Sequence, residues 1–204
     1  MKVNRDQFLE DGYFIQRNAI PPDQLADLRA AYEIMVEHQK IIWARDRDPD
    51  GPPGGVWEMG AQPRLALHNM GDQLDAQTAQ TIEIWLHENT LGTSTQLLQM
   101  PHAAVTEMMM MCNPVRDRGP AGWHRDMYPP YCAPLMGYVD DIVENGPRYV
   151  QWNISLYEDD VLCVIPGSHI RYRTDEEQAA MAGDRKGELA GAVQIDHQRQ
   201  ALFE

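Results

Sequence analysis

Two features are scarce in this 204-residue sequence, and each scarcity narrows the possible functions. Cysteine occurs three times, at Cys112, Cys132 and Cys163, with no spacing typical of a metal site or a disulfide framework. We therefore expect reduced thiols and a cytoplasmic location. Long apolar runs are missing, and the first residues contain no apolar signal core. We therefore expect neither membrane insertion nor secretion.

Positive charge is also scarce, because 17 Lys and Arg face 31 Asp and Glu and leave a net charge of −14. A phosphate backbone or an anionic membrane surface would repel such a chain, so we expect no nucleic-acid or membrane partner. A hydrophobic fraction of 43% predicts a folded globular protein. The length suits one domain over residues 1–204, with a mainly helical part over 1–100 and a β-rich core over 101–204.

Caps and apolar spacing predict the elements of the N-terminal part. They indicate a helix over Asn4–Asp11 stopped by Gly12, a strand over Tyr13–Arg17, a long amphipathic helix opened by Pro21-Pro22, and a helix from Asp72 to Gly92. The stretch from Asp46 to Gly60 is rich in Gly, Pro and charge. It predicts a surface loop, with a lid over a pocket as the alternative.

Strand patterns dominate the expectation for the C-terminal part. Ala103–Cys112, with four consecutive Met residues, predicts a strand buried on both faces. Tyr149–Tyr157 alternates apolar and polar residues and precedes the apolar run Val161–Ile165, so we expect the two to form a hairpin. No element is predicted in the Pro- and Gly-rich stretch that ends at Pro147. A polar helix is predicted over Tyr172–Glu188, and Ala192–Phe203 looks like the start of a strand.

The most specific chemical signal is His124-Arg125-Asp126. In an extended strand, residues i and i+2 point to the same side, so His124 and Asp126 can approach one cation. An imidazole and a carboxylate are two of the three protein ligands in a 2-His-1-carboxylate iron site. With 7 His and 18 Asp in the sequence, chance alone gives such a triplet roughly 0.6 times. The alternative is therefore a strand end whose carboxylate pairs with Arg125 or another Arg.

The order of several short motifs supports the metal interpretation. The sequence runs from Asp11–Gln16 through the helix opened by Pro-Pro to Trp123-His124-Arg125-Asp126, and then to Val164–Arg171 with its Pro-Gly-Ser-His. This order resembles the phytanoyl-CoA dioxygenase family of Fe(II)- and 2-oxoglutarate-dependent oxygenases. The resemblance implies a mostly β fold with N-terminal helices, namely a double-stranded β-helix, also called a jelly roll and similar to the cupins.

The resemblance also implies a site. His124 and Asp126 would be metal ligands for Fe(II), with 2-oxoglutarate and O₂ as co-substrates. The family's distal His and its 2-oxoglutarate-binding Arg would fall beyond Glu204, so we expect a chain that lacks the third ligand and the last strands. His197 and His169 are the alternative third ligands within the sequence. The polar face of the predicted strand (Gln151, Asn153 and Ser155), together with Trp123, would line the pocket.

Three functions follow from this reading. The first is an oxygenase that hydroxylates a small or medium organic substrate through iron and 2-oxoglutarate. The second is a non-catalytic jelly-roll protein for binding or assembly, or an inactive fragment without the distal His. The third is a cupin-like metal enzyme that uses no 2-oxoglutarate. Exposed strand edges would allow oligomers to form in each case.

Overall fold

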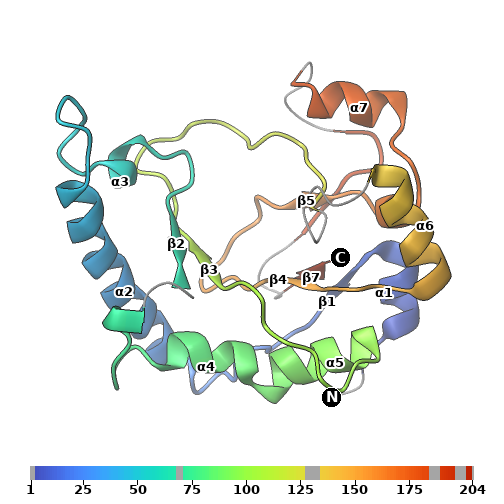
Figure 1. The fold of residues 1–204 in the computed structure, drawn as a ribbon, viewed down its shortest axis with the longest axis horizontal. Coiled ribbons are helices and arrows are strands. Elements are labelled where there is room, and N and C mark those ends of the chain that lie inside the picture. The colour runs from blue at the N-terminus through green and yellow to red at the C-terminus, as the bar shows by residue number, and fades with distance from the viewer. Residues whose placement is uncertain (1–2, 68–70, 127–133, 184–188, 196–200, 204) are drawn as a thin grey trace. The chain divides into compact units, whose positions relative to one another are not determined.

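The computed structural model describes residues 3–67, 71–126, 134–183, 189–195 and 201–203 (Figure 1). The chain divides into two compact units. Unit 1 combines Met1–Ala19, Glu88–Ala103 and Pro120–Glu204, and unit 2 combines Ile20–His87 and Ala104–Gly119. Among the described helices, none is both long and apolar enough to cross a membrane. The expectation of a single domain stays a prediction.

Unit 1 contains a small antiparallel sheet in the order β1-β7-β4 and a separate pair, β5-β6. Its helices are α1 (Arg5–Asp11), the π-helix η3 (Glu88–Gly92), α5 (Thr93–Leu98), α6 (Leu135–Asn145), the 3-10 helix η4 (Ser168–Ile170) and α7 (Asp175–Met181). Its strands are β1 (Tyr13–Ile15), β4 (Gln151–Asn153), β5 (Cys163–Val164), β6 (Val193–Gln194) and β7 (Ala201–Phe203).

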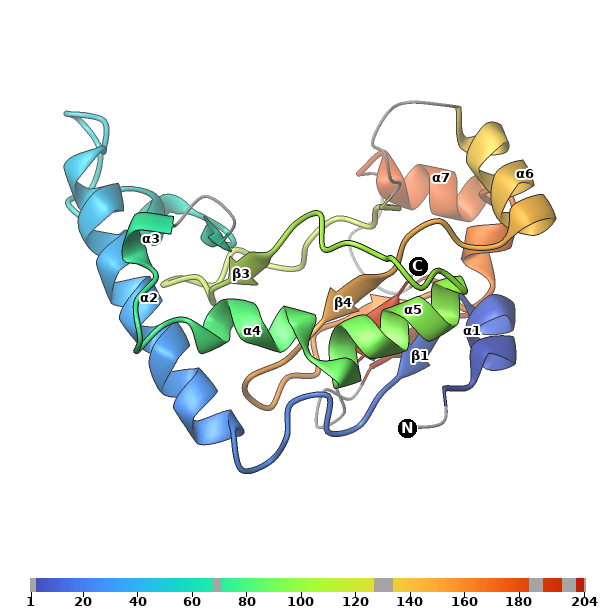
Figure 2. The same cartoon turned by 60° about the horizontal axis from the view of Figure 1, so that its bottom comes forward.

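The apolar core of unit 1 lies where α1 and α5 meet the sheet. Phe8 and Leu97 are fully buried, and Phe14 and Trp152 pack against them from β1 and β4. Burying a side chain such as Phe8 contributes about 1.5–3 kcal/mol. The Trp152 indole donates a hydrogen bond to Ser94 Oγ at 2.9 Å. Figure 2 shows α5 running beside the strands that it covers.

A buried polar network explains why the helix predicted from Asp72 to Gly92 is interrupted. The continuous part, α4, covers only Gln80–Leu86, and η3 follows it as a π-helical turn. The fully buried Gln16 donates to the Asn89 carbonyl at 2.6 Å and accepts from Thr93 Oγ1 at 2.8 Å. A buried amide needs such partners, and η3 supplies one while the first residue of α5 supplies the other.

Unit 2 is organised around one long helix. Its elements are α2 (Leu25–Arg45), α3 (Val56–Met59), β2 (Arg64–Ala66), the 3-10 helix η2 (Gly71–Gln73), α4 (Gln80–Leu86) and β3 (Met109–Met111), with β2 and β3 antiparallel. The predicted apolar face of α2 is confirmed, because Leu28, Met35 and Val36 are buried. The buried Tyr32 hydroxyl donates to the Thr81 carbonyl at 3.1 Å, and burial raises the pKa of Tyr32 to about 12.

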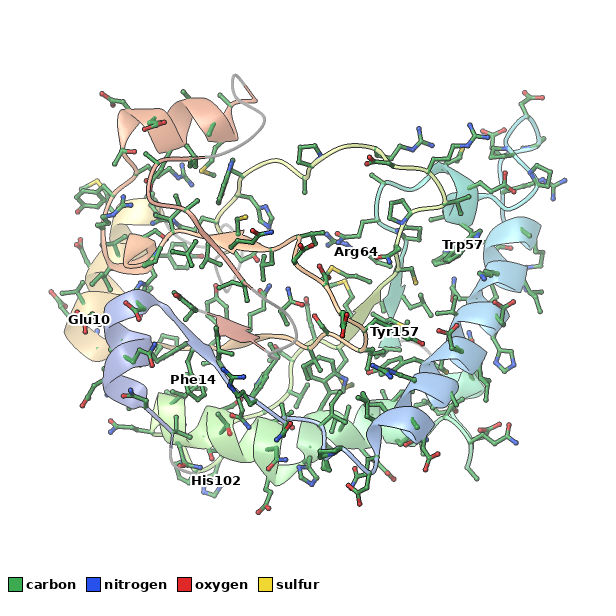
Figure 3. The ribbon with its side chains drawn as sticks, turned by 180° about the vertical axis from the view of Figure 1, so that it is seen from behind. Glu10, Phe14, Trp57, Arg64, His102 and Tyr157 are labelled. Atoms are coloured by element: carbon green, nitrogen blue, oxygen red, sulfur yellow. The ribbon has the colours of Figure 1, made fainter. Side chains whose placement is uncertain are left out.

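The Gly- and Pro-rich segment from Asp46 to Gly60 contains the short helix α3 and packs on α2. Trp57 of α3, labelled in Figure 3, stacks on Trp43 of α2 with ring centroids 6.2 Å apart. Lys40 Nζ lies 4.1 Å from the centre of the Trp57 ring, a cation–π distance. A Cβ at Gly55 would overlap the Trp43 carbonyl. These contacts hold the segment against α2.

The predicted mostly β fold, a jelly roll, is wrong. That fold needs about eight strands in two sheets, whereas the described strands are two or three residues long and form sheets of three, two and two strands. The physical reason is that an apolar run becomes a strand only where other strands pair with it along its length. Val161–Ile165 illustrates this, because only Cys163 and Val164 are paired, and their partner is β6.

Three local expectations also fail. The predicted hairpin does not form, because β4 pairs with β7 while β5 pairs with β6. The Met-rich strand is not buried on both faces, since Met109 and Met111 are exposed. Helix α6 (Leu135–Asn145) lies in the stretch for which no element was predicted. The apolar residues of α6 follow a helical spacing. The Pro and Gly residues around them are typical of a loop, and for that reason the helix was not predicted.

The end of α1 makes a close contact with the Pro-Gly-Ser-His motif. As predicted, α1 begins after the N-cap Asn4 and ends at Gly12, which is left-handed at φ 78°. The buried His169 approaches the Leu9 carbonyl through Nε2 at 3.1 Å, and the Gly167 amide donates to the Asp11 carbonyl at 2.8 Å. A Cβ at Gly12 would overlap the His169 ring. Two motifs far apart in the sequence therefore fit together here.

This contact makes Gly12 a sensitive position. We expect Gly12→Ala to lower the free energy of unfolding by about 3 kcal/mol, because it adds left-handed strain to overlap with a buried ring. Urea denaturation followed by circular dichroism measures the change. The matched control is Gly191→Ala, which has a φ of 81° and open space around a Cβ. It should lose only about 1–2 kcal/mol, and equal losses for both variants would contradict the contact.

Candidate metal site

His124 and Asp126 lie on the same side of an irregular segment of unit 1. His124 Nε2 is 3.7 Å from Asp126 Oδ1, and the two side chains are 67% and 52% exposed. The segment is not a strand, so the expected geometry arises without the expected secondary structure. At this exposure an ion pair contributes at most about 1 kcal/mol. Stability alone is therefore a weak reason for the arrangement.

The backbone sets the tautomer of His124. Its Nδ1 lies 3.0 Å from the Gly122 carbonyl oxygen. A carbonyl only accepts hydrogen bonds, so Nδ1 carries the proton when the ring is neutral, and Nε2 presents a lone pair. This nitrogen lies 3.7 Å from Asp126 Oδ1, which is also an acceptor. Two acceptors this close repel each other unless a proton or a metal cation lies between them.

Asp126 is held in place from β4 and the residues just before it. Gln151 Nε2 donates to Asp126 Oδ2 at 3.1 Å, which leaves Oδ1 directed at His124. The Tyr149 hydroxyl donates to the Asp126 carbonyl oxygen at 3.0 Å. Partners of this kind orient ligating carboxylates and imidazoles in metal sites. Gln151 therefore contacts a candidate ligand directly.

The donor set fits a divalent cation as a two-point chelate. With metal bonds of about 2.1 Å to nitrogen and oxygen, two donors on one ion lie at most about 4.2 Å apart. The observed 3.7 Å is within that span, and exposed side chains can close it further. One imidazole and one carboxylate suit Fe(II), Mn(II) or Zn(II). The residues therefore fit a metal with two of the three ligands expected.

The third ligand is not assembled within the described part of the chain. Among those residues, no group of three or more His, Cys, Asp or Glu side chains could hold a metal ion. His169 is 8% exposed and directs Nε2 at the Leu9 carbonyl, so that nitrogen is engaged with the backbone. His197 lies outside the described residues, and its candidacy as third ligand stays a prediction.

The predicted pocket residues have different surroundings. Gln151 contacts Asp126, while Trp123, Asn153 and Ser155 are half-buried. An open hollow in unit 2 contains none of them and is lined by Leu74, Asp75, Ala76, Ala79, Ile82 and Glu83. Tyr149 was missed at this site. Its position two residues before Gln151, on the same side of a strand, was a signal that would have found it.

Three comparisons bear on the family. The chain was compared with protein-family models, curated protein sequences and solved structures, and none of them matches. Membership of the phytanoyl-CoA dioxygenase family therefore stays a prediction.

The surroundings of His169 predict a pH dependence of stability. Burial lowers the pKa of His169, and Arg125 lowers it further against the opposing effect of the Leu9 carbonyl. As pH falls below about 6.5, the unfolded chain takes up this proton before the folded chain does, so stability falls. We expect unfolding free energies at pH 7.5 and 5.5 to differ less in His169→Gln than in the wild type. His102→Gln, which removes an exposed imidazole, is the control, and identical pH dependence in wild type and His169→Gln would refute the assignment.

Proposed function

We propose that this protein binds Fe(II) through His124 and Asp126 and uses it with 2-oxoglutarate to hydroxylate a small or medium organic substrate. The observation that carries the proposal is the pair itself. An imidazole nitrogen and a carboxylate oxygen lie 3.7 Å apart on two exposed side chains, and the other carboxylate oxygen accepts a hydrogen bond from Gln151. The order of the sequence motifs supports the choice of iron and 2-oxoglutarate. The cysteine usage supports a cytoplasmic location.

Each residue has a stated task in this proposal. The Gly122 carbonyl keeps the proton of His124 on Nδ1, so Nε2 is available as a ligand. Gln151 and Tyr149 keep Asp126 Oδ1 directed at the same point. Bound iron would supply oxygen activation coupled to decarboxylation of 2-oxoglutarate.

A second function has one specific observation in its favour. The described residues bring together no third ligand, and a site with two protein ligands binds metal weakly. A non-catalytic binding or assembly protein needs no oxygen chemistry and tolerates that loss. The two functions separate in one assay, since the oxygenase forms succinate from 2-oxoglutarate in an Fe(II)-dependent manner and the binding protein does not.

The direct test is Fe(II) titration under anaerobic conditions, followed by calorimetry. We expect His124→Ala and Asp126→Ala each to weaken binding at least tenfold, because each removes one of two chelating groups. His102→Ala and Asp160→Ala remove an exposed imidazole and an exposed carboxylate elsewhere in unit 1 and should bind as the wild type does. Equal affinity in all four variants would rule out the site.

Gln151 provides a finer test. Gln151→Leu keeps the size of the side chain and removes the donor to Asp126 Oδ2. We expect Fe(II) affinity to fall about tenfold, in the range usual for partners of metal ligands, while the unfolding free energy changes by under about 1 kcal/mol, since the side chain is exposed. Asn153→Leu on the same strand is the control. Unchanged affinity in Gln151→Leu would show that this contact does not position the ligand.

A further inference from the structure

Three arginines of unit 1 lie near one another in a chain whose net charge is −14. They are Arg125, which lies between His124 and Asp126, and Arg171 and Arg173, which precede α7. Arg125 Nη1 donates to the Arg171 carbonyl at 3.1 Å. Arg171 and Arg173 both contribute to the electrostatic surroundings of Arg125, as does Glu177. The cluster thus joins two segments that are 46 residues apart.

One carboxylate within the cluster is already in use. Arg171 donates two hydrogen bonds of 2.9 and 2.5 Å to the Glu177 carboxylate. Glu177 also accepts from the Thr174 amide at 2.9 Å in the capping box that begins α7. Arg171 and Thr174 together engage both carboxylate oxygens, so Glu177 balances one arginine of the three. The four side chains keep a net charge of about +2.

Among the residues that the structure describes, the other two arginines have no comparable partners. Arg125 is half-buried and its described hydrogen bond is to a neutral carbonyl; burial, followed by Arg173, lowers its pKa. Arg173 reaches Gln178 Oε1 at 3.4 Å, which is long for a hydrogen bond. Its Nε is buried and has no hydrogen-bond partner in the part of the chain that the structure describes. A buried donor left unpaired costs about 1–3 kcal/mol.

Excess positive charge together with an unpaired buried donor lowers the stability of the fold and favours the binding of an anion. Like charges gathered at a partly buried position repel each other, and an added anion relieves the repulsion. Guanidinium groups match the planar geometry of carboxylates and phosphates through paired hydrogen bonds. Asp175 and Glu176 in the first turn of α7 reduce the field, so moderate and salt-sensitive affinity is expected.

We propose that Arg125, Arg171 and Arg173 form a binding site for an oxyanion, the carboxylate or phosphate group of the substrate. The assignment to a substrate rests on the proposed oxygenase function. Arg125 lies between the two candidate metal ligands along the chain, with neighbouring Cα atoms about 3.8 Å apart. The substrate class is therefore an organic acid or a phosphate ester.

The test uses the whole, metal-free chain at low ionic strength, titrated with inorganic phosphate and with acetate and followed by ¹H–¹⁵N spectra. We expect at least one of them to bind. Affinity should fall at least tenfold in Arg125→Gln and in Arg173→Gln. Arg116→Gln, which neutralises an exposed arginine of unit 2, should bind as the wild type does. Tighter phosphate binding indicates a phosphate ester, and tighter acetate binding indicates a carboxylic acid.

Two results would overturn the site: neither anion binds, or the Arg125 and Arg173 variants bind as well as the Arg116 control. Arg173→Lys guards against simple unfolding, because it keeps the charge and loses the paired hydrogen bonds, so it should bind anions more tightly than Arg173→Gln and less tightly than the wild type. The measurement needs neither iron nor 2-oxoglutarate. If anions bind while Fe(II) does not, the oxygenase proposal fails and the anion site stands, and the reverse result removes the anion site alone.

Discussion

The contact between His169 and the turn that ends α1 is the constraint on which the candidate site depends. Gly12 leaves room for the imidazole, and the Leu9 carbonyl holds its Nε2. This fixes η4 and, two residues later, the Arg171 carbonyl to which Arg125 donates. Arg125 is in turn bonded to both His124 and Asp126 along the chain. The packing of His169 against α1 is thus connected to the candidate metal pair through Arg171 and Arg125.

This chain of contacts changes the role of the Pro-Gly-Ser-His motif. A histidine near a possible iron site invites assignment as a ligand, but His169 is buried and bonded to backbone. It positions the polypeptide on which the arginines lie. His124 and Asp126, the two candidate metal ligands, have side chains that are open to solvent. Metal binding and packing are therefore assigned to different histidines.

Local signals in the sequence predicted local features well. The N-cap Asn4 and the stop at Gly12 mark α1, the apolar face of α2 is buried, and a helix forms within the predicted polar segment at α7. The closeness of His124 and Asp126 follows from their spacing in any extended segment. Strand pairing could not be predicted from the sequence. The partners of β4 and β5 lie far along the chain, and an apolar run does not specify its partner. The contact from Arg125 to Arg171 was missed for the same reason, since it spans 46 residues.

The central claim is that His124 and Asp126 share one metal ion. Mn(II) is a paramagnetic stand-in that broadens the NMR signals of nuclei near it, so substoichiometric Mn(II) added to ¹⁵N-labelled protein reports where it binds. The account predicts that amide signals of residues 122–126 and 149–151 broaden first, while those around His102 stay sharp. Broadening that starts at the acidic turn Glu158-Asp159-Asp160, or is spread evenly over the acidic surface, would contradict it.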